Sequence, residues 1–592
     1  MSDMASTVIQ CDMNRRRCER ENPDQLCGMI RRKAIPSIRQ ICICSPVDTA
    51  IICMASEQNG EVIDQSTYRP PLLQRRQVVI ALSGAMLALF LGSLDQTVVG
   101  TAMPKIVSDL GGFTRYTWIT TSYIVAATIA VPITGKLSDM YGRKLFYIIG
   151  LALFTLGSLF CGLSQDMMQI IAFRGLQGIG AGIIMANAFI VIGDLFPPSE
   201  RGKYQGLTAG VFGVAAAVGP TLGGFITDSL SWEWVFLINV PLGIPLIILF
   251  MFYLPGMERG YSKHRVDYPG VVALILTVMP AMLALSWAGV DYPWISPLII
   301  GMFLFSAAMA VVFILIERRS DEPILPLWIF TNRIVLVSIS IIALTGAVMY
   351  GGIVFIPLFF QGVLGVSATA TGGLVTPLLL AVVGGSLISG QVLSRAGGHY
   401  RRQGLVGLAI MALGIGLLST LNAESHNSEA VIYITLTGLG LGITYPLYTI
   451  AVQNAVPYAV MGVATSSATF FRNIGGALGL AILGSVMNNR FATEFLNRIS
   501  PEAEAVISPE PLHSLIHNPQ ALLNTESQAQ LKDIYDQSGP AGAGLYEQMF
   551  QSLRQALDST VMEVFLTGLV VVLIAWAVNL FLVEIPLRKH HV

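Results

Sequence analysis

Long apolar stretches alternate with short polar segments along most of this chain, from residue 78 to residue 583. Each stretch is close to the roughly 20 residues that a helix needs to cross a bilayer, so each predicts one transmembrane helix. One such stretch could equally be a buried helix of a soluble protein, but fourteen in series predict an all-α polytopic membrane protein. The predicted spans are 78–103, 118–135, 145–163, 167–192, 206–226, 234–254, 271–290, 297–316, 334–360, 371–393, 405–421, 430–452, 463–487 and 561–583.

The composition agrees with a membrane protein, because 53% of the 592 residues are hydrophobic and only 12% are charged. A soluble chain carries about 25% charged residues. The net charge of −1 adds little, but the basic residues gather in alternate connections, with Lys105 and Arg115 as exceptions. Cytoplasmic loops carry the excess of Lys and Arg. We therefore expect both termini in the cytoplasm and a multi-pass protein of the cell membrane, with a vacuolar or vesicle membrane as the alternative.

Two long polar segments lie outside the predicted spans. Residues 1–77 contain six of the seven cysteines, without the C-x-x-C spacing of a zinc site. Their polar, Arg-rich composition predicts a disordered cytoplasmic tail, in which we expect no disulfides because the cytosol is reducing. Residues 488–559 predict a long outer loop before the last span.

A weak internal repeat indicates that the chain has two related halves. The sequence GKLSDMYGRK follows the second span and GQVLSRAGGH follows the tenth, with two glycines at the same spacing. The repeat predicts two six-helix halves, 78–254 and 334–592, with two further helices inserted in 255–333. Paired repeats around a midplane binding site are typical of secondary transporters.

The first copy of this repeat resembles the signature loop of the major facilitator superfamily. The span count and further motifs resemble its fourteen-span drug:proton antiporter branch, above all fungal multidrug and toxin efflux pumps, over residues 72–587. The resemblance implies a conformational latch that holds the cytoplasmic side closed; the alternative is an anchor of positive charges. We expect the two glycines of the latch to form tight turns. The latch residues are Gly135, Asp139, Gly142, Arg143 and Lys144.

An acidic residue within a membrane span is costly and indicates function, and Asp95 lies in the first span. Asp95 and Arg174 stand eight and seven residues from the outer ends of their spans, roughly 11 to 12 Å at 1.5 Å per residue. The family fold makes these two helices neighbours, and the resemblance implies that both residues take part in proton coupling. The alternative is a static ion pair that orients the helices.

The fifth span contains the sequence GPTLGG, which resembles a motif found in exporters more than in uptake carriers. Small residues let membrane helices approach closely, and a proline bends a helix. The residues of this antiporter motif are Gly219, Pro220, Gly223 and Gly224.

Other classes of protein find no support in the sequence. It contains no G-x-x-x-x-G-K-[ST] loop, so we expect no ATP binding, and it shows no cluster of metal ligands. We expect a monomeric transporter in the lipid bilayer, without enzymatic activity, cofactor or metal. Its expected partners are protons and a small organic substrate, with no nucleic acid.

We predict that the chain exports amphipathic organic compounds, such as drugs, toxins or secondary metabolites, in exchange for protons. The alternatives are a carrier of siderophore iron or another organic solute and, from another class, a non-transporting membrane receptor. Arg472 has no acidic partner in the spans of its half, so it serves either the structure or an anionic substrate. Aromatic side chains with few polar groups suit a permissive cavity, although some will be ordinary packing. The cavity candidates are Gln177, Tyr350, Phe355, Phe359, Gln361, Tyr445, Tyr448, Gln453 and Arg472.

Overall fold

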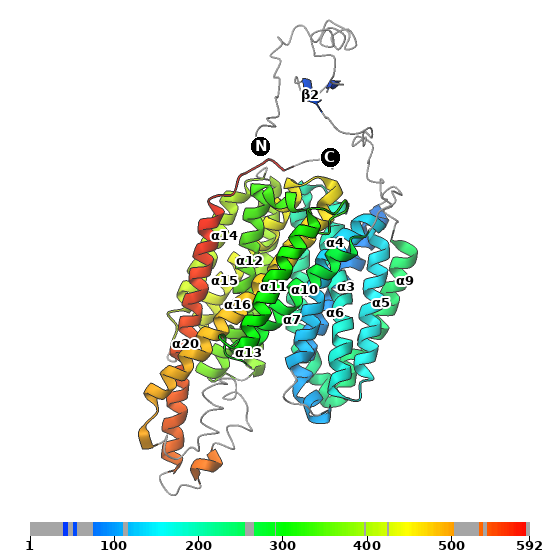
Figure 1. Cartoon of the computed structure of the whole chain (residues 1–592). Coiled ribbons are helices and arrows are strands. Elements are labelled where there is room, and N and C mark those ends of the chain that lie inside the picture. Colours follow the sequence, from blue (N-terminus) through cyan, green and yellow to red (C-terminus); the bar gives the residue numbers. More distant parts are fainter. Residues whose placement is uncertain are drawn as a thin grey trace. The chain divides into compact units, whose positions relative to one another are not determined.

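The computed structural model describes three parts of the chain: residues 40–44, 51–55 and 75–587. The last part has gaps at 111–116, 255–265, 290–291, 367, 396–397, 423–424, 503–531 and 537–541. Within the described residues, fourteen helices are long and apolar enough to cross a membrane (Figure 1). The predicted all-α membrane fold is therefore confirmed.

In sequence order, the helices can be grouped as two sets of six with a pair between them; the division of the chain into two halves stays a prediction. The first group is α3 (Arg75–Leu110), α4 (Thr117–Tyr141), α5 (Arg143–Gly162), α6 (Met167–Leu195), α7 (Pro198–Ser229) and the broken span α8 (Glu233–Leu237) with α9 (Asn239–Tyr253). The pair is α10 (Tyr268–Trp287) and α11 (Pro297–Glu317). The second group is α12 (Arg333–Leu358), α13 (Ala368–Arg395), α14 (Tyr400–Leu418), α15 (Asn427–Ala455), α16 (Met461–Arg498) and α20 (Gly542–Asn579).

Small residues let the helices within each half pack backbone to backbone. On α6, a side chain at Gly178 or Gly182 would collide with the backbone of α4, and one at Gly180 with that of α5. On α15, Gly438 and Gly442 meet the backbone of α13 in the same way. Glycine is the residue that permits such close approach. The two helices thus share a Gly-x-Gly-x-Gly pattern whose glycines allow neighbouring backbones to approach.

We call the end of the bundle where α3 begins and α20 finishes the terminal end, and the opposite end the loop end (Figure 1). At the loop end, α16 and α20 extend into residues 488–559, which were predicted to be a loop. Apolar side chains explain the extension, because Phe491 and Phe495 of α16 join Met549 and Leu553 of α20 in one buried cluster.

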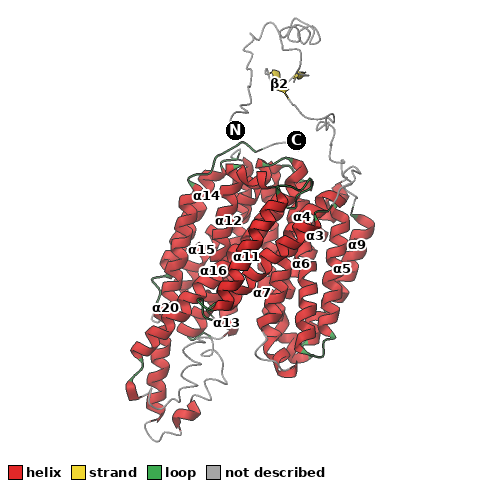
Figure 2. Cartoon of the chain, viewed as in Figure 1, coloured by secondary structure: helices red, strands yellow, loops and turns green. Residues whose placement is uncertain are grey.

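Two short strands, β1 (Gln40–Cys44) and β2 (Ile51–Ala55), form an antiparallel hairpin within the segment predicted as a disordered tail (Figure 2). These strands were not predicted from the sequence. The other residues of 1–74 lie outside the described part of the chain, so the prediction of disorder stays a prediction for them.

Candidate functional site

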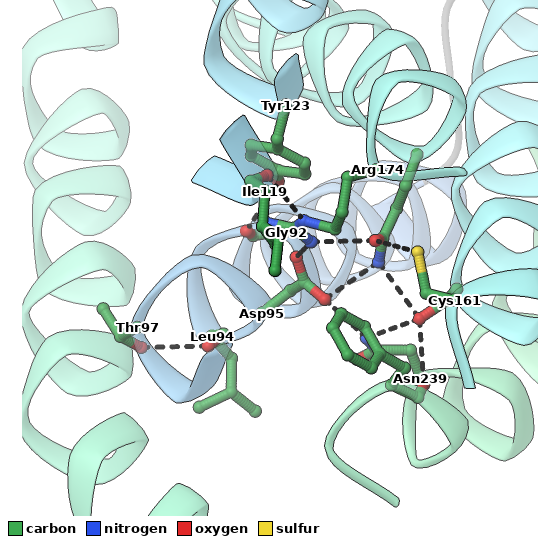
Figure 3. Close-up of polar contacts among 12 residues, drawn as sticks. Gly92, Leu94, Asp95, Thr97, Ile119, Tyr123, Cys161, Arg174 and Asn239 are labelled. Carbon is green, nitrogen blue, oxygen red and sulfur yellow. Dashed lines mark hydrogen bonds and ion pairs between the residues drawn. The ribbon is translucent and has the colours of Figure 1, made fainter. Parts of the chain in front are cut away.

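A buried ion pair joins Asp95 of α3 to Arg174 of α6, as their matching depths predict (Figure 3). The Arg174 Nη1 donates to Asp95 Oδ2 at 2.6 Å, and each residue is only 1% exposed. Each charge therefore compensates the other in a region from which water is excluded.

Amide and hydroxyl groups complete the surroundings of Asp95. Its Oδ1 accepts hydrogen bonds from Gln177 Nε2 at 2.8 Å and from Asn239 Nδ2 at 2.9 Å. The same two amides donate to the Ser158 hydroxyl, which itself donates to the Phe236 carbonyl. Both oxygens of the Asp95 carboxylate thus accept hydrogen bonds, from Arg174, Gln177 and Asn239.

The guanidinium of Arg174 has its own set of partners. Its Nη1 also donates to Gln177 Oε1 at 2.8 Å, and its Cζ lies 4.0 Å from the centroid of the Tyr123 ring. The Tyr123 hydroxyl donates to the Gly92 carbonyl on α3. A planar cation stacked on an aromatic face is held in one orientation. We call Asp95, Ser158, Arg174, Gln177 and Asn239 the acid cluster.

Sequence reasoning found Asp95 and Arg174 but missed Ser158, Tyr123 and Asn239. It also assigned Gln177 to the substrate cavity, whereas this side chain lies within the acid cluster. The available signal was that polar side chains inside membrane spans usually pair with one another. Asn239 occupies the start of α9, at the break that separates α8 from α9.

The antiporter motif packs against the helix that carries Asp95. A side chain at Gly219 or Gly223 of α7 would collide with Thr97 or Thr101 of α3, respectively. The Thr97 hydroxyl also donates to the Ala215 carbonyl at 3.1 Å. Of the other two motif residues, Pro220 is exposed and Gly224 faces open space. The motif therefore fixes α3 against α7 close to the acid cluster.

At the terminal end, one buried arginine binds two carboxylates that both reach the second half. Arg143 pairs with Asp139, and its Nε donates to Asp194 Oδ2 at 2.9 Å. The Val463 backbone N–H, in the first turn of α16, donates to Asp139 Oδ2 at 3.0 Å. The Tyr458 hydroxyl donates to Asp194 Oδ1 at 2.9 Å. A carboxylate is stabilised at a helix N-terminus, so these contacts hold the halves together.

The predicted tight turns are half right. Gly142 separates α4 from α5 with φ of 94°, a left-handed conformation that favours glycine, and Lys144 follows in the first turn of α5. Gly135 is not in a turn, since α4 continues to Tyr141. Gly135 instead packs against Ser466 of α16, where any side chain would collide.

Further contacts close the terminal end. Arg201 and Gln205 of α7 both donate to Gln453 Oε1 on α15 at 3.3 Å. The backbones of α7 and α13 touch at Gly202 and Gly390. Gln453 was expected to line the substrate cavity, but the structure places it in this contact between the halves.

A small cavity of about 10 Å³ lies between α12, α15 and α16. Of the predicted cavity residues, Tyr445 and Arg472 line it, and Tyr350 lies nearby against Gly476. Phe355, Phe359 and Tyr448 belong instead to the buried core that includes α20, and Gln361 is half-buried in the π-helix η3 (Phe359–Val363). The lining consists of Ile342, Thr345, Gly346, Met349, Leu441, Thr444, Tyr445 and Arg472.

Comparison with known proteins places this geometry in context. The model of the Major Facilitator Superfamily matches residues 85–480. The multidrug transporter protein MdtP of Bacillus subtilis is 38% identical over 513 residues, which are 86% of this chain and 94% of the relative. The efflux pump FUS6 of Gibberella fujikuroi is 33% identical over 422 residues, or 70% of this chain and 75% of the relative.

Two solved structures share the fold. The human organic anion transporter MFSD10 aligns with a TM-score of 0.53 at 14% identity, covering 85% of this chain and all of its own. The proton:xylose symporter XylE aligns with a TM-score of 0.52 at 12% identity, covering 86% of this chain and 97% of its own. At these identities the likeness supports the arrangement of helices alone.

Proposed function

Because the chain belongs to the Major Facilitator Superfamily, we propose that it is an antiporter that exports drugs or metabolites in exchange for protons. The names of its relatives, which include a multidrug transporter and a fungal efflux pump, support export of amphipathic organic compounds. They favour export over the alternative of siderophore uptake and over a receptor that transports nothing.

The observation that carries proton coupling is the acid cluster. Asp95 is a buried carboxylate whose oxygens accept from Arg174, Gln177 and Asn239. Protonation would remove the charge that compensates Arg174 and would turn one accepting oxygen into a donor. The most stable arrangement of the cluster therefore depends on whether a proton is bound, which is the requirement for coupling a proton to a conformational change.

A continuous set of contacts can carry this change to the interface between the halves. Thr97, two residues from Asp95, packs on Gly219 of α7. The same helix touches α13 of the second half through Gly202 and Gly390. A shift of α3 on proton binding thus acts on a helix that takes part in closing the terminal end.

In this proposal, the residues around Arg143 form the latch. Asp139 and Asp194 each accept one hydrogen bond from the second half, so opening the terminal end breaks both. We propose that the terminal end faces the cytoplasm of a cell membrane, in accordance with the positive charges of its connections. An acidic exterior then drives protons inward and the substrate outward.

Inside-out membrane vesicles test this function. With an acidic lumen and no ATP, wild-type vesicles should accumulate fluorescent drugs, and a protonophore should abolish accumulation. Asp95→Asn should eliminate the response to the pH gradient. Asp109→Asn is the matched control, because it makes the same change at an exposed position of α3. Equal gradient-driven accumulation by wild type and Asp95→Asn would contradict the proposed coupling.

A further inference from the structure

Arg472 is a buried cation without a carboxylate beside it. Arg472 is 6% exposed, and its Nη2 donates to the Thr449 hydroxyl at 3.3 Å. Its Cζ lies 4.1 Å from the centroid of the Tyr445 ring. Within the described residues, none of the ion pairs includes Arg472.

The comparison with Arg174 shows what this position lacks. Both arginines stack on a tyrosine ring, at 4.0 Å for Arg174 and 4.1 Å for Arg472. Arg174 also binds the carboxylate of Asp95, whereas the neighbours of Arg472 provide a hydroxyl and an aromatic face. A buried charge without a counter-charge is unfavourable and marks a functional position in a membrane protein.

The surroundings of Arg472 suit a molecule that is apolar with one anionic group. The side chain borders the small cavity between α12, α15 and α16, together with the hydroxyl-bearing residues Thr345 and Thr444 and the apolar residues Met349 and Leu441. Arg472 stands eleven residues from the start of α16, or about 16 Å along the helix. That depth is near the middle of a hydrocarbon layer of about 30 Å.

We propose that Arg472 binds the carboxylate of an amphipathic organic anion, and that organic anions are among the exported substrates. The guanidinium offers a planar set of donors that matches a carboxylate, and Tyr445 holds it in orientation. The bound anion supplies the counter-charge that Asp95 supplies to Arg174. This assignment of the substrate class rests on the proposed export function.

Binding to purified protein, without any gradient, separates this proposal from proton coupling. The probes are aryl-alkanoates of increasing size, from 4-phenylbutanoate upward, each paired with its uncharged methyl ester. Wild-type protein should gain thermal stability with at least one carboxylate and less with its ester. Arg472→Gln should weaken carboxylate binding on the order of 10- to 100-fold and leave ester binding unchanged. Arg490→Gln, an exposed position of the same helix, is the control.

The melting temperatures of the ligand-free variants test whether the role of Arg472 is purely structural. Arg174→Gln should lower the melting temperature, because it leaves Asp95 buried without its partner. Arg472→Gln should not, because it removes a charge that no described carboxylate compensates. The proposal is overturned if no carboxylate binds better than its ester, or if Arg472→Gln destabilises as much as Arg174→Gln. Asp95→Asn protein should still prefer the carboxylates, even if gradient-driven transport fails.

Discussion

Asn239 is the least anticipated member of the acid cluster, and its replacement by leucine gives a sharp prediction. The change keeps the number and branching of the side-chain heavy atoms but removes two donated hydrogen bonds. These run to Asp95 Oδ1 and to the Ser158 hydroxyl, both at 2.9 Å. Both acceptors keep their bond from Gln177, so the cluster is weakened without leaving either acceptor bare.

The magnitude follows from the kinds of bond lost. A hydrogen bond to a charged group contributes about 1.5–3 kcal/mol, and one between neutral groups about 0.5–1.5 kcal/mol. Because Gln177 still serves both acceptors, we expect the lower part of the summed range, about 2 kcal/mol of the free energy of unfolding. The loss should shrink by about half in an Asp95→Asn background, since the charge-assisted contribution is then absent.

Denaturant unfolding in micelles measures these free energies. Asn187→Leu is the matched control, because Asn187 is a buried amide of α6 whose Nδ2 donates only to the Ile183 carbonyl of its own helix. We expect Asn239→Leu to destabilise the protein more than Asn187→Leu and to reduce proton-driven export. Equal destabilisation by the two variants, or an undiminished effect in the Asp95→Asn background, would refute the charge-assisted role of Asn239.

Three other predictions follow from the packing and the topology. Gly219→Ala should impair transport, because its methyl group meets Thr97. The control Gly224→Ala, whose methyl group meets open space, should transport as wild type does. Equal transport by the two variants would show that α3 and α7 need not touch. Asp139→Ala should lower the turnover rate more than the affinity for substrate, and an unchanged rate in transport assays would reduce the latch to an anchor. Epitopes inserted at Lys263 and Gln528 should be accessible to antibodies from the cytoplasm and from outside, respectively, and the opposite pattern would reverse the topology.

The depth of a residue in the membrane could be predicted from the sequence. A helix rises 1.5 Å per residue, and successive spans run in opposite directions. The pairing of Asp95 with Arg174 follows from these two facts, once the helices are known to be neighbours. Counting residues also places Arg472 near the middle of its span.

The direction in which a side chain points could not be predicted in the same way. In helices such as α12 and α15, polar and apolar residues are not segregated to opposite sides, so these helices lack the polar stripe that reveals which side of a soluble helix faces the solvent. Both Tyr445 and Tyr448 were predicted to line the cavity. Tyr445 does so beside Arg472, whereas Tyr448, three residues later, donates to Asn579 of α20. Gly135 was misplaced for a related reason, because a glycine in a turn and a glycine at a helix contact look alike in a single sequence.

In the proposed transport cycle, Asp95 binds and releases a proton in exchange for an exported molecule. The most direct test is the movement of protons caused by the substrate alone. Purified protein is reconstituted into liposomes that contain a pH-sensitive dye and start without a pH gradient, and a panel of amphipathic drugs and aryl carboxylates is added outside. Some of these molecules should enter the liposomes through wild-type transporters that are oriented inside out. As they enter, protons leave in exchange and the pH of the lumen should rise. Asp95→Asn should abolish this rise. Uptake of the molecule by wild-type protein without proton movement would rule out proton exchange.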